Sequence, residues 1–249
     1  MIVTKSPAEL EIMREAGRIT AAALRLVGEA VRPGVTTREL DAIAEEYIRS
    51  QGAAPAFKGY QGFPATLCTS PNDQVVHGIP GRRVLSEGDI LSVDCGAIVD
   101  GYYGDSAVTF AVGTVSMETQ RLLEVTAASL DAAIAECRPG RRLSDVSHAV
   151  QAVVEAAGFS VVREYVGHGI GRAMHEEPQV PNYGSPGKGP QLKPGMVLAI
   201  EPMVNAGSHA VHSLDDGWTV VTDDGGMSAH FEHTVAVTEH GPLVLTKEA

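Results

Sequence analysis

Two stretches of this sequence repeat each other. One begins at Leu85 and reads LSEGDILSVDCG, and the other begins at Leu192 and reads LKPGMVLAIEPM. Aligned without a gap, both combine an apolar run typical of a buried strand with a carboxylate, which is Asp94 in the first copy and Glu201 in the second. Because a buried strand rarely carries a charge, a carboxylate at the end of both strands predicts a shared purpose for the pair.

The repeat continues upstream of these strands. Residues 32–52 (RPGVTTRELDAIAEEYIRSQG) match residues 138–158 (RPGRRLSDVSHAVQAVVEAAG), with one apolar helical stripe in each copy. A further helix is predicted before each segment, at Pro7–Val31 and at Met117–Cys137. The expected N-caps of the four helices are Ser6, Thr36, Ser116 and Ser144.

Each unit therefore consists of two helices followed by strands. Two such units favour an α+β fold with two halves related by an approximate twofold axis, rather than a solenoid. We expect one catalytic domain over residues 1–249, with an N-terminal half of about 1–113 and a C-terminal half of about 114–249. In this arrangement the strand carboxylates of both halves converge near the axis.

Composition excludes several classes of protein. The chain has 249 residues, of which 44% are hydrophobic, and its formal net charge is −12, which argues against nucleic acid as a partner. The three cysteines show no CxxC spacing, so neither a disulfide framework nor a thiolate zinc site is indicated. The N-terminus soon becomes a charged amphipathic pattern, and no apolar run is long enough to span a bilayer. We expect a cytoplasmic protein with no membrane partner.

A second carboxylate follows in each half. Asp105 precedes an alternating apolar run in YYGDSAVTF, and Glu232 does the same in AHFEHTVAV. The dipeptide Asp100-Gly101 predicts a tight hairpin between the first two acidic strands. Four carboxylates in one apolar interior cannot all stay ionised without compensation, and bound metal ions are the usual compensation.

The histidines indicate what kind of metal site this is. His168 lies in GHGIGRAMHEEP among glycines that allow close backbone approach, His175 follows in the same segment, and His77 lies in a related HGIP. The other six histidines, including His230 and His233, lack such a setting and are expected to be ordinary core or surface side chains. The predicted ligands are Asp94, Asp105, His168, Glu201 and Glu232.

One imidazole and four carboxylates favour harder divalent ions such as Mn, Fe(II), Co or Mg over structural zinc. Shared carboxylates allow two ions roughly 3.5–4 Å apart, an arrangement that activates water for hydrolysis. A single-iron oxygenase that uses His175 and Glu177 is an alternative, but it leaves the repeated carboxylates without a role.

This set of motifs resembles the methionine aminopeptidases, specifically their short bacterial type I form, over nearly the whole chain. The resemblance is carried by NDQVVHGIP, SVDCG, GDSA, GHGIGRAMHEEPQVPNYG, AIEPM, DGWT and FEHTVAV in this order. It implies the pita-bread fold, in which two pseudo-twofold halves share an antiparallel sheet backed by helices. It also implies two divalent ions, with Asp105 and Glu232 between them, Asp94 on one ion, and His168 and Glu201 on the other.

The resemblance further implies a catalytic role for three residues. Glu201 would take the proton of the attacking water and pass it to the leaving amine. His175 would hydrogen-bond the scissile carbonyl, and His77 the substrate main chain, and neither would bind metal. The side chains expected to line the methionine pocket are Tyr60, Phe63, Cys68, Met174 and Trp218, with Phe57 at its edge.

The sequence departs from the common bacterial pattern at four positions. Phe57 stands where cysteine is common, Phe63 where tyrosine is, Met174 where phenylalanine is, and Gly96 where threonine is. The ligand positions are unaffected, whereas the detailed shape of the pocket depends on these replacements.

The implied substrates are peptides and nascent chains with an N-terminal methionine followed by a small residue. Prolidases and aminopeptidase P share much of this site, but they usually carry an extra N-terminal domain for which this chain leaves no room. Type II enzymes insert a helical segment between the positions of Glu201 and Glu232, which lie close together here. A catalytically inactive pita-bread binding protein at the ribosome is a further alternative, although such relatives typically lose ligands. We expect a monomer whose contact with the ribosome, if formed, is transient.

Overall fold

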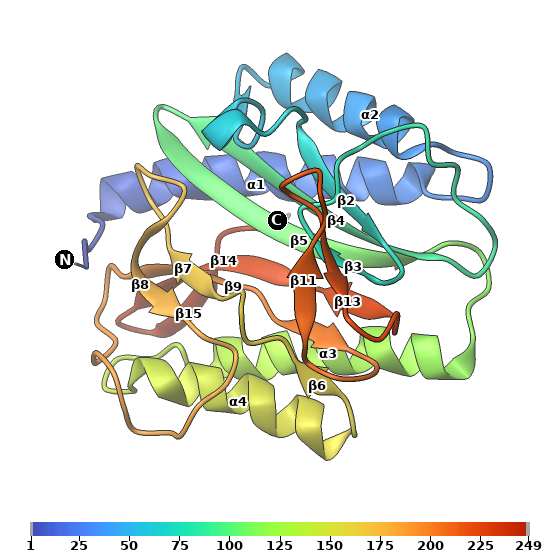
Figure 1. The fold of residues 1–249 in the computed structure, drawn as a ribbon. Helices are drawn as coiled ribbons and strands as arrows, with labels where there is room; N and C mark the ends of the chain where they lie inside the picture. The colour runs from blue at the N-terminus through green and yellow to red at the C-terminus, as the bar shows by residue number, and fades with distance from the viewer. Residues whose placement is uncertain (1, 248–249) are drawn as a thin grey trace.

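Two pairs of helices, one in each half, lie on one side of the molecule. In the computed structural model, which describes residues 2–247, α1 spans Pro7–Ala30 and α2 Thr37–Ser50, and the second pair is α3, Met117–Glu136, and α4, Leu143–Ala156. Figure 1 shows α1 and α2 in the upper half of the view and α3 and α4 in the lower half, with β14 between the two pairs. The sequence predicted that α1 ends at Val31 and α3 at Cys137. These two residues are the C-caps, so each helix ends one residue earlier than predicted.

The predicted N-caps are confirmed for three helices. Ser6 and Thr36 each form a reciprocal capping box, and the hydroxyl of Ser116 accepts a backbone N–H of the first turn of α3. The prediction of Ser144 as an N-cap is wrong. Arg142 is the N-cap because its N–H donates to the Asp145 carboxylate, which leaves Ser144 inside the helix.

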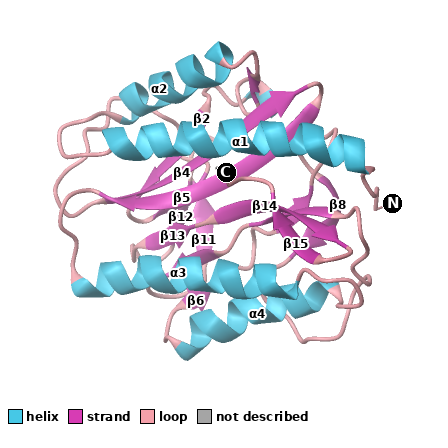
Figure 2. Cartoon of the chain, turned by 180° about the vertical axis from the view of Figure 1, so that it is seen from behind, coloured by secondary structure: helices cyan, strands magenta, loops and turns pink. Residues whose placement is uncertain are grey.

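A nine-stranded antiparallel sheet runs through both halves in the order β1-β4-β5-β14-β9-β7-β8, with β2 on β4 and β15 on β14. Its long central strands are β4, Ile90–Val99, β5, Tyr102–Ala111, and β14, Glu232–Thr238. The shorter strands are β1, Ala54–Pro55; β2, Leu67–Pro71; β7, Gly167–Gly169; β8, Glu176–Val180; β9, Val197–Ile200; and β15, Gly241–Val244. The helices cover the back of this sheet (Figure 2).

Each half has its own apolar core between helices and sheet. The N-terminal core joins α1 and α2 to β4, with Leu24, Leu40 and Leu91 among its members. The C-terminal core joins α3 and α4 to β9 and β14, with Leu122 and Val150 among its members. The halves meet where β5 pairs with β14, through Ser106 opposite His233 and Ala107 opposite Glu232. This agrees with the predicted α+β arrangement of helix-backed halves.

Two smaller, three-stranded sheets complete the fold, and the first of them packs against α3 and α4. One consists of β13, β10 and β6, which span Ser228–His230, Met203–Asn205 and Ser160–Val161. The other consists of β11, β12 and β3, which span Val211–Ser213, Val220–Thr222 and Gln74–Val76. A 3₁₀ turn, η1, spans Tyr60–Gly62. No helix among residues 2–247 is long and apolar enough to cross a membrane.

The hairpin predicted at Asp100-Gly101 is confirmed, since both residues have positive φ and connect β4 to β5 directly.

The two repeated carboxylates lie at different places relative to their strands. Asp94, however, lies in the middle of β4, which continues for five residues beyond it to Val99, so the expectation that it ends the strand is wrong. Glu201 does follow the last residue of β9. The next residue is Pro202, which has no N–H to donate to a continued ladder.

Candidate metal centre and adjoining pocket

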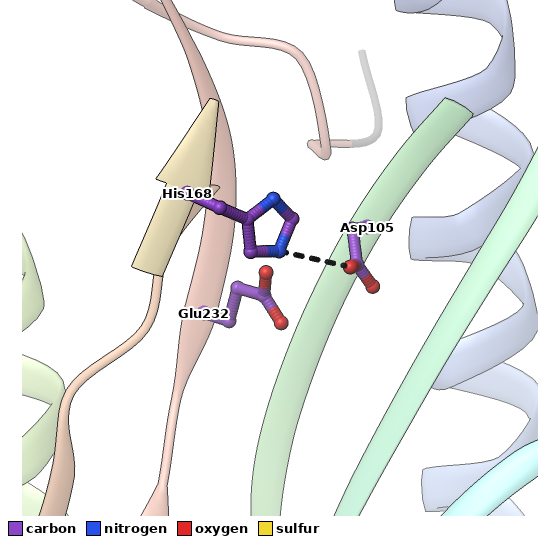
Figure 3. A group of neighbouring side chains, drawn as sticks. All are labelled: Asp105, His168 and Glu232. Carbon is purple, nitrogen blue, oxygen red and sulfur yellow. Dashed lines mark ion pairs between the residues drawn. The ribbon is translucent and has the colours of Figure 1, made fainter. Parts of the chain in front are cut away.

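The centre of the site lies at the seam between the halves. Asp105 of β5, Glu232 of β14 and His168 of β7 are all buried, and their ligand atoms lie within 4.8 Å of one another. Figure 3 shows the three side chains pointing toward one another from separate strands. The sequence predicted all three as ligands, and the pairing of β5 with β14 brings the two carboxylates together.

The other two predicted ligands line the same cavity, which has a volume of about 170 Å³. Glu201 is close to the imidazole, with its Oε1 3.5 Å from Nε2 of His168, which in turn lies 3.9 Å from Oδ2 of Asp105. Asp94 faces the cavity from β4, next to Asp105 of the neighbouring strand. The structure therefore brings together all five residues of the predicted ligand set.

The imidazole of His168 is oriented for a ligand. Its Nδ1 lies 2.9 Å from the carbonyl oxygen of Gly169, to which an Nδ1–H donates, and this leaves the Nε2 lone pair facing the carboxylates. Burial, reinforced by the neighbouring His175, lowers the pKa of His168 to about 4. The ring is therefore neutral at physiological pH, as coordination requires.

Three of the four carboxylates have an oxygen without a hydrogen-bond partner in the described part of the protein. Oδ1 of Asp94, Oδ1 of Asp105 and Oε1 of Glu232 are buried without a hydrogen bond. Burial, followed by the repulsion of neighbouring carboxylates, raises the pKa values of Asp105, Glu201 and Glu232, and burial raises the pKa of Asp94. Unsatisfied oxygens and crowded negative charge are what bound divalent cations would relieve, so the residues present fit such ions.

An apolar pocket opens beside these ligands. It is lined by all the side chains predicted for it, namely Phe57, Tyr60, Phe63, Cys68, Met174 and Trp218, together with Gln61, which the sequence did not single out. Phe63 and Trp218 meet edge to face with ring centroids 5.0 Å apart. Cys68 of β2 pairs with Asp94 of β4, so pocket and metal ligands share adjacent strands.

The structure explains one pair of departures from the family pattern. A Cβ added at Gly96 would lie 2.8 Å from the Cβ of Ala56 and 3.0 Å from Cε1 of Phe57. The ring of Phe57 thus occupies the space that a side chain at position 96 would need. A large residue at one position and glycine at the other are complementary.

His175 and His77 line the cavity without joining the ligand group. The hydroxyl of Tyr60 lies 2.8 Å from Nδ1 of His175, and the ring of His175 is 4.4 Å from that of His168. When Tyr60 donates this hydrogen bond, His175 carries its proton on Nε2 and can donate it. His77 has a positive φ of 60°, and burial lowers its pKa to about 4, so it is neutral.

His230 lies beside the site, although the sequence did not predict it there. This side chain is 1% exposed, and its unpartnered Nε2 lies 3.8 Å from Oε2 of Glu201. Burial lowers its pKa to about 3. The sequence offers one signal for this residue: it lies two positions before Glu232, and side chains two positions apart on an extended chain point to the same face. Its proximity to Glu201 can be seen only in the folded structure.

Two other expectations concern residues outside the site. His233 faces the opposite side of the sheet, where Nδ1 lies 2.9 Å from the hydroxyl of Thr246, in keeping with an ordinary core histidine. Glu177, the carboxylate of the single-iron alternative, is exposed and does not line the cavity. The geometry gives that alternative no support.

Known proteins with similar sequences and structures are metallopeptidases. The model of metallopeptidase family M24 matches residues 11–239. Methionine aminopeptidase 1 of Bacillus subtilis is 59% identical over 99% of this chain and 100% of its own length. The solved structure of methionine aminopeptidase from Thermotoga maritima superimposes with a TM-score of 0.98 at 50% identity, with complete coverage of both chains.

A prolidase from Pyrococcus horikoshii shares the fold, with a TM-score of 0.80 at 23% identity, but this chain covers only 65% of it. These similarities confirm the pita-bread fold that the resemblance implied. The relatives with high identity over their full length are methionine aminopeptidases. The chain therefore belongs to metallopeptidase family M24 and, within it, to the type I methionine aminopeptidases.

Proposed function

We propose that this chain, a metal-dependent aminopeptidase by family, uses two divalent ions to remove the N-terminal methionine from peptides and nascent proteins whose second residue is small. The observation that carries the proposal is the convergence of Asp105, His168 and Glu232 beside a pocket lined largely by aromatic side chains. Removal of an N-terminal methionine is the activity that the names of its relatives describe. The preference for a small second residue follows the family pattern.

When bound, the two ions would be held by these five residues: Asp105 and Glu232 would contribute to both ions, Asp94 to one, and His168 with Glu201 to the other. The ions, when bound, would act as Lewis acids that make water a nucleophile near neutral pH. Mn, Fe(II) and Co suit this oxygen-rich set with a single imidazole.

The chain's own side chains supply the remaining steps. Glu201 takes the proton of the attacking water on a carboxylate oxygen and delivers it to the leaving amine. His175, held by Tyr60, donates its Nε2–H to the scissile carbonyl oxygen, where negative charge develops. His77 hydrogen-bonds the substrate main chain.

The pocket selects methionine by shape and by polarity. Phe63, Met174 and Trp218 offer aromatic and thioether surface to an unbranched apolar side chain. Contacts between sulfur and aromatic rings contribute roughly 0.3–1.5 kcal/mol each. A charged side chain would lose its hydration there without gaining a partner, so lysine and glutamate are rejected.

We further propose a monomeric cytoplasmic enzyme in which residues 1–249 act as one catalytic domain, with halves of about 1–113 and 114–249. Nascent chains are the substrates of this proposal, and contact with the ribosome is transient. The alternative of an inactive binding protein is disfavoured because all five ligand positions are intact. A prolidase or aminopeptidase P activity has only a likeness of fold in its favour.

Replacement of Glu201 by Gln tests the mechanism. An amide cannot accept the proton of water, so we expect kcat for Met-Ala-Ser to fall by about 10²–10⁴-fold, while affinity for a peptide inhibitor that binds no metal changes little. The control is the wild type with Met-Ile-Ser and Lys-Ala-Ser, neither of which should be cut efficiently. Wild-type turnover by Glu201→Gln would remove Glu201 as the base. A wild type that releases no methionine with Mn, Fe(II) or Co would favour the binding protein instead.

A further inference from the structure

The N-terminal segment of the chain reaches the loop that carries two residues of the proposed methionine site. We propose that the buried ion pair between Lys5 and Glu176 positions Met174 and His175, so that Lys5 is a positioning residue for methionine binding and cleavage. This inference rests on the roles assigned to Met174 and His175 in the proposed function.

The ion pair is tight and buried. Nζ of Lys5 lies 2.6 Å from Oε2 of Glu176, and the two side chains are 4% and 15% exposed. Nζ also donates to the carbonyl oxygen of Val3 at 3.2 Å, and the backbone N–H of Lys5 donates to Gly195 at 2.7 Å. By contrast, the surface pair of Arg141 with Glu136 has the same length but a cation that is 53% exposed.

Glu176 uses its two oxygens for different purposes. Oε2 binds Lys5, whereas Oε1 accepts the backbone N–H of Ala173 at 3.2 Å. The carbonyl of Ala173 in turn accepts the N–H of Gly171 at 3.2 Å. One carboxylate therefore connects the N-terminal segment to the backbone of the loop immediately before Met174.

The loop fits closely against this pair. A Cβ added at Gly171 would lie 2.4 Å from Cε of Lys5 and 2.6 Å from Oε1 of Glu176, so only glycine allows this approach. The loop has a second contact with the start of α1. Arg172 stacks over the ring of Tyr102 at 4.3 Å, and the hydroxyl of Tyr102 donates to Glu9.

The consequence for the site follows from chain connectivity. Met174 and His175 directly precede Glu176, and they lie between the two anchored points, Ala173 and Glu176. Removal of the lysine charge leaves the largely buried Glu176 carboxylate without a counter-charge, so the carboxylate would move toward water and take the loop with it. A displacement of about 1 Å in a reacting group can cost about 10²-fold in rate.

The test is Lys5→Met, purified with its metal. We expect kcat/KM for Met-Ala-Ser to fall by about 10–100-fold, the range typical for loss of an outer partner of a catalytic site. The affinity for free L-methionine, followed by the fluorescence of Trp218, the only tryptophan, should weaken about tenfold by the same reasoning. Metal content should not change, because no ligand is altered.

Three further variants separate positioning from general stability. Lys5→Arg keeps the charge and should restore most of the methionine affinity. Arg141→Met removes a surface pair of equal length and should leave affinity and kcat unchanged. If Lys5→Met does not fold, Glu176→Asp tests the proposal in its place. The shorter aspartate side chain cannot reach both Lys5 and Ala173, so this variant should weaken methionine binding in the same way.

A Lys5→Met or Glu176→Asp protein with a lower melting temperature but wild-type kcat and methionine affinity would overturn the proposal. Met174→Ala distinguishes this failure from failure of the pocket assignment. If Met174→Ala weakens methionine binding and the ion-pair variants do not, only the positioning role is wrong. If Met174→Ala also binds methionine normally, the pocket assignment itself is wrong.

Discussion

The two halves of the molecule build their shares of the site in different ways. In the N-terminal half, Asp94 and Asp105 come from the interior of two ten-residue strands that a two-residue turn connects. In the C-terminal half, Glu201 lies just beyond a four-residue strand, and Glu232 is the first residue of β14. The C-terminal half also adds His168 from β7, for which the N-terminal half has no equivalent among the ligands.

The cause of the difference is the connection between paired strands. Asp100 and Gly101 alone connect β4 to β5. By contrast, the connection from β9 to β14 is a long segment that contains β10 to β13 and Trp218. Symmetry thus provides one pair of carboxylates from each half. Departure from symmetry provides the imidazole of His168, the different placement of Glu201, which we propose as the base, and the tryptophan in the lining of the pocket.

The largest predicted effect concerns the two carboxylates that meet at the seam. Asp105→Asn and Glu232→Gln should both lower the bound metal and reduce kcat/KM by more than the roughly 10²-fold typical for outer partners of a metal site. Equal losses would support equivalent roles for the two halves. Metal analysis and methionine release measure this, with Asp145→Asn, on the surface of α4, as a control. A variant that keeps both metals and full activity would contradict the ligand assignment of its half.

The second prediction concerns all four carboxylates together. Without metal, burial raises the pKa values of all four carboxyl groups, and repulsion by neighbouring carboxylates adds to this for Asp105, Glu201 and Glu232, so the folded protein holds protons that the unfolded chain has lost. The unfolding free energy of the metal-free protein should therefore fall as pH rises above the unfolded values, by about 1.4 kcal/mol per pH unit for each extra proton held. Bound cations replace these protons.

The gap in melting temperature between metal-loaded and metal-free protein should accordingly be wider at pH 8 than at pH 5.5. Thermal melts with and without a chelator, at both pH values, measure it. If the gap in melting temperature were the same at both pH values, the pKa values of the four carboxyl groups would not be raised in the folded, metal-free protein. Repetition with Asp94→Asn and with Glu201→Gln would show which half contributes more to the gap.

How far the sequence predicts the structure also differs between the halves. Caps such as Ser6 with Glu9 are local signals, and the carboxylates of the predicted ligand set follow from the repeat, so both were predictable. Ser144 was mistaken for a cap because a side-chain oxygen was expected at the N-cap, whereas the repeat aligns Arg142 with the N-cap Thr36. Each of these two residues also forms an isolated bridge, to Gln191 and Val84 respectively. The pairing of Lys5 with Glu176 joins positions 171 residues apart and has no signature in either segment.

The third prediction tests a packing feature of the N-terminal half. Gly96→Thr should lower the unfolding free energy by about 1–3 kcal/mol, because its Cβ would collide with Ala56 and Phe57. Phe57→Cys added to Gly96→Thr should recover part of this loss by vacating the space. Urea unfolding of the two single variants and the double variant gives the coupling free energy. Additive losses would show that Phe57 does not occupy the space of a side chain at position 96.

The smallest predicted effect is confined to the turn that distinguishes the halves. Gly101 has a φ of +76°, so Gly101→Ala should cost about 1–2 kcal/mol of unfolding free energy from left-handed backbone alone. Space is not limiting, since the nearest atom to an added Cβ is a guanidinium nitrogen of Arg172 at 3.6 Å. We expect kcat/KM to stay at the wild-type value, because the β4–β5 ladder, paired along the full length of both strands, holds Asp94 and Asp105 away from the turn. Denaturant unfolding and methionine release measured on the same preparation test both parts. If Gly101→Ala lowered activity as well as stability, ligand geometry in the N-terminal half would depend on its turn, and the contrast between a rigid hairpin and a long connection would fail.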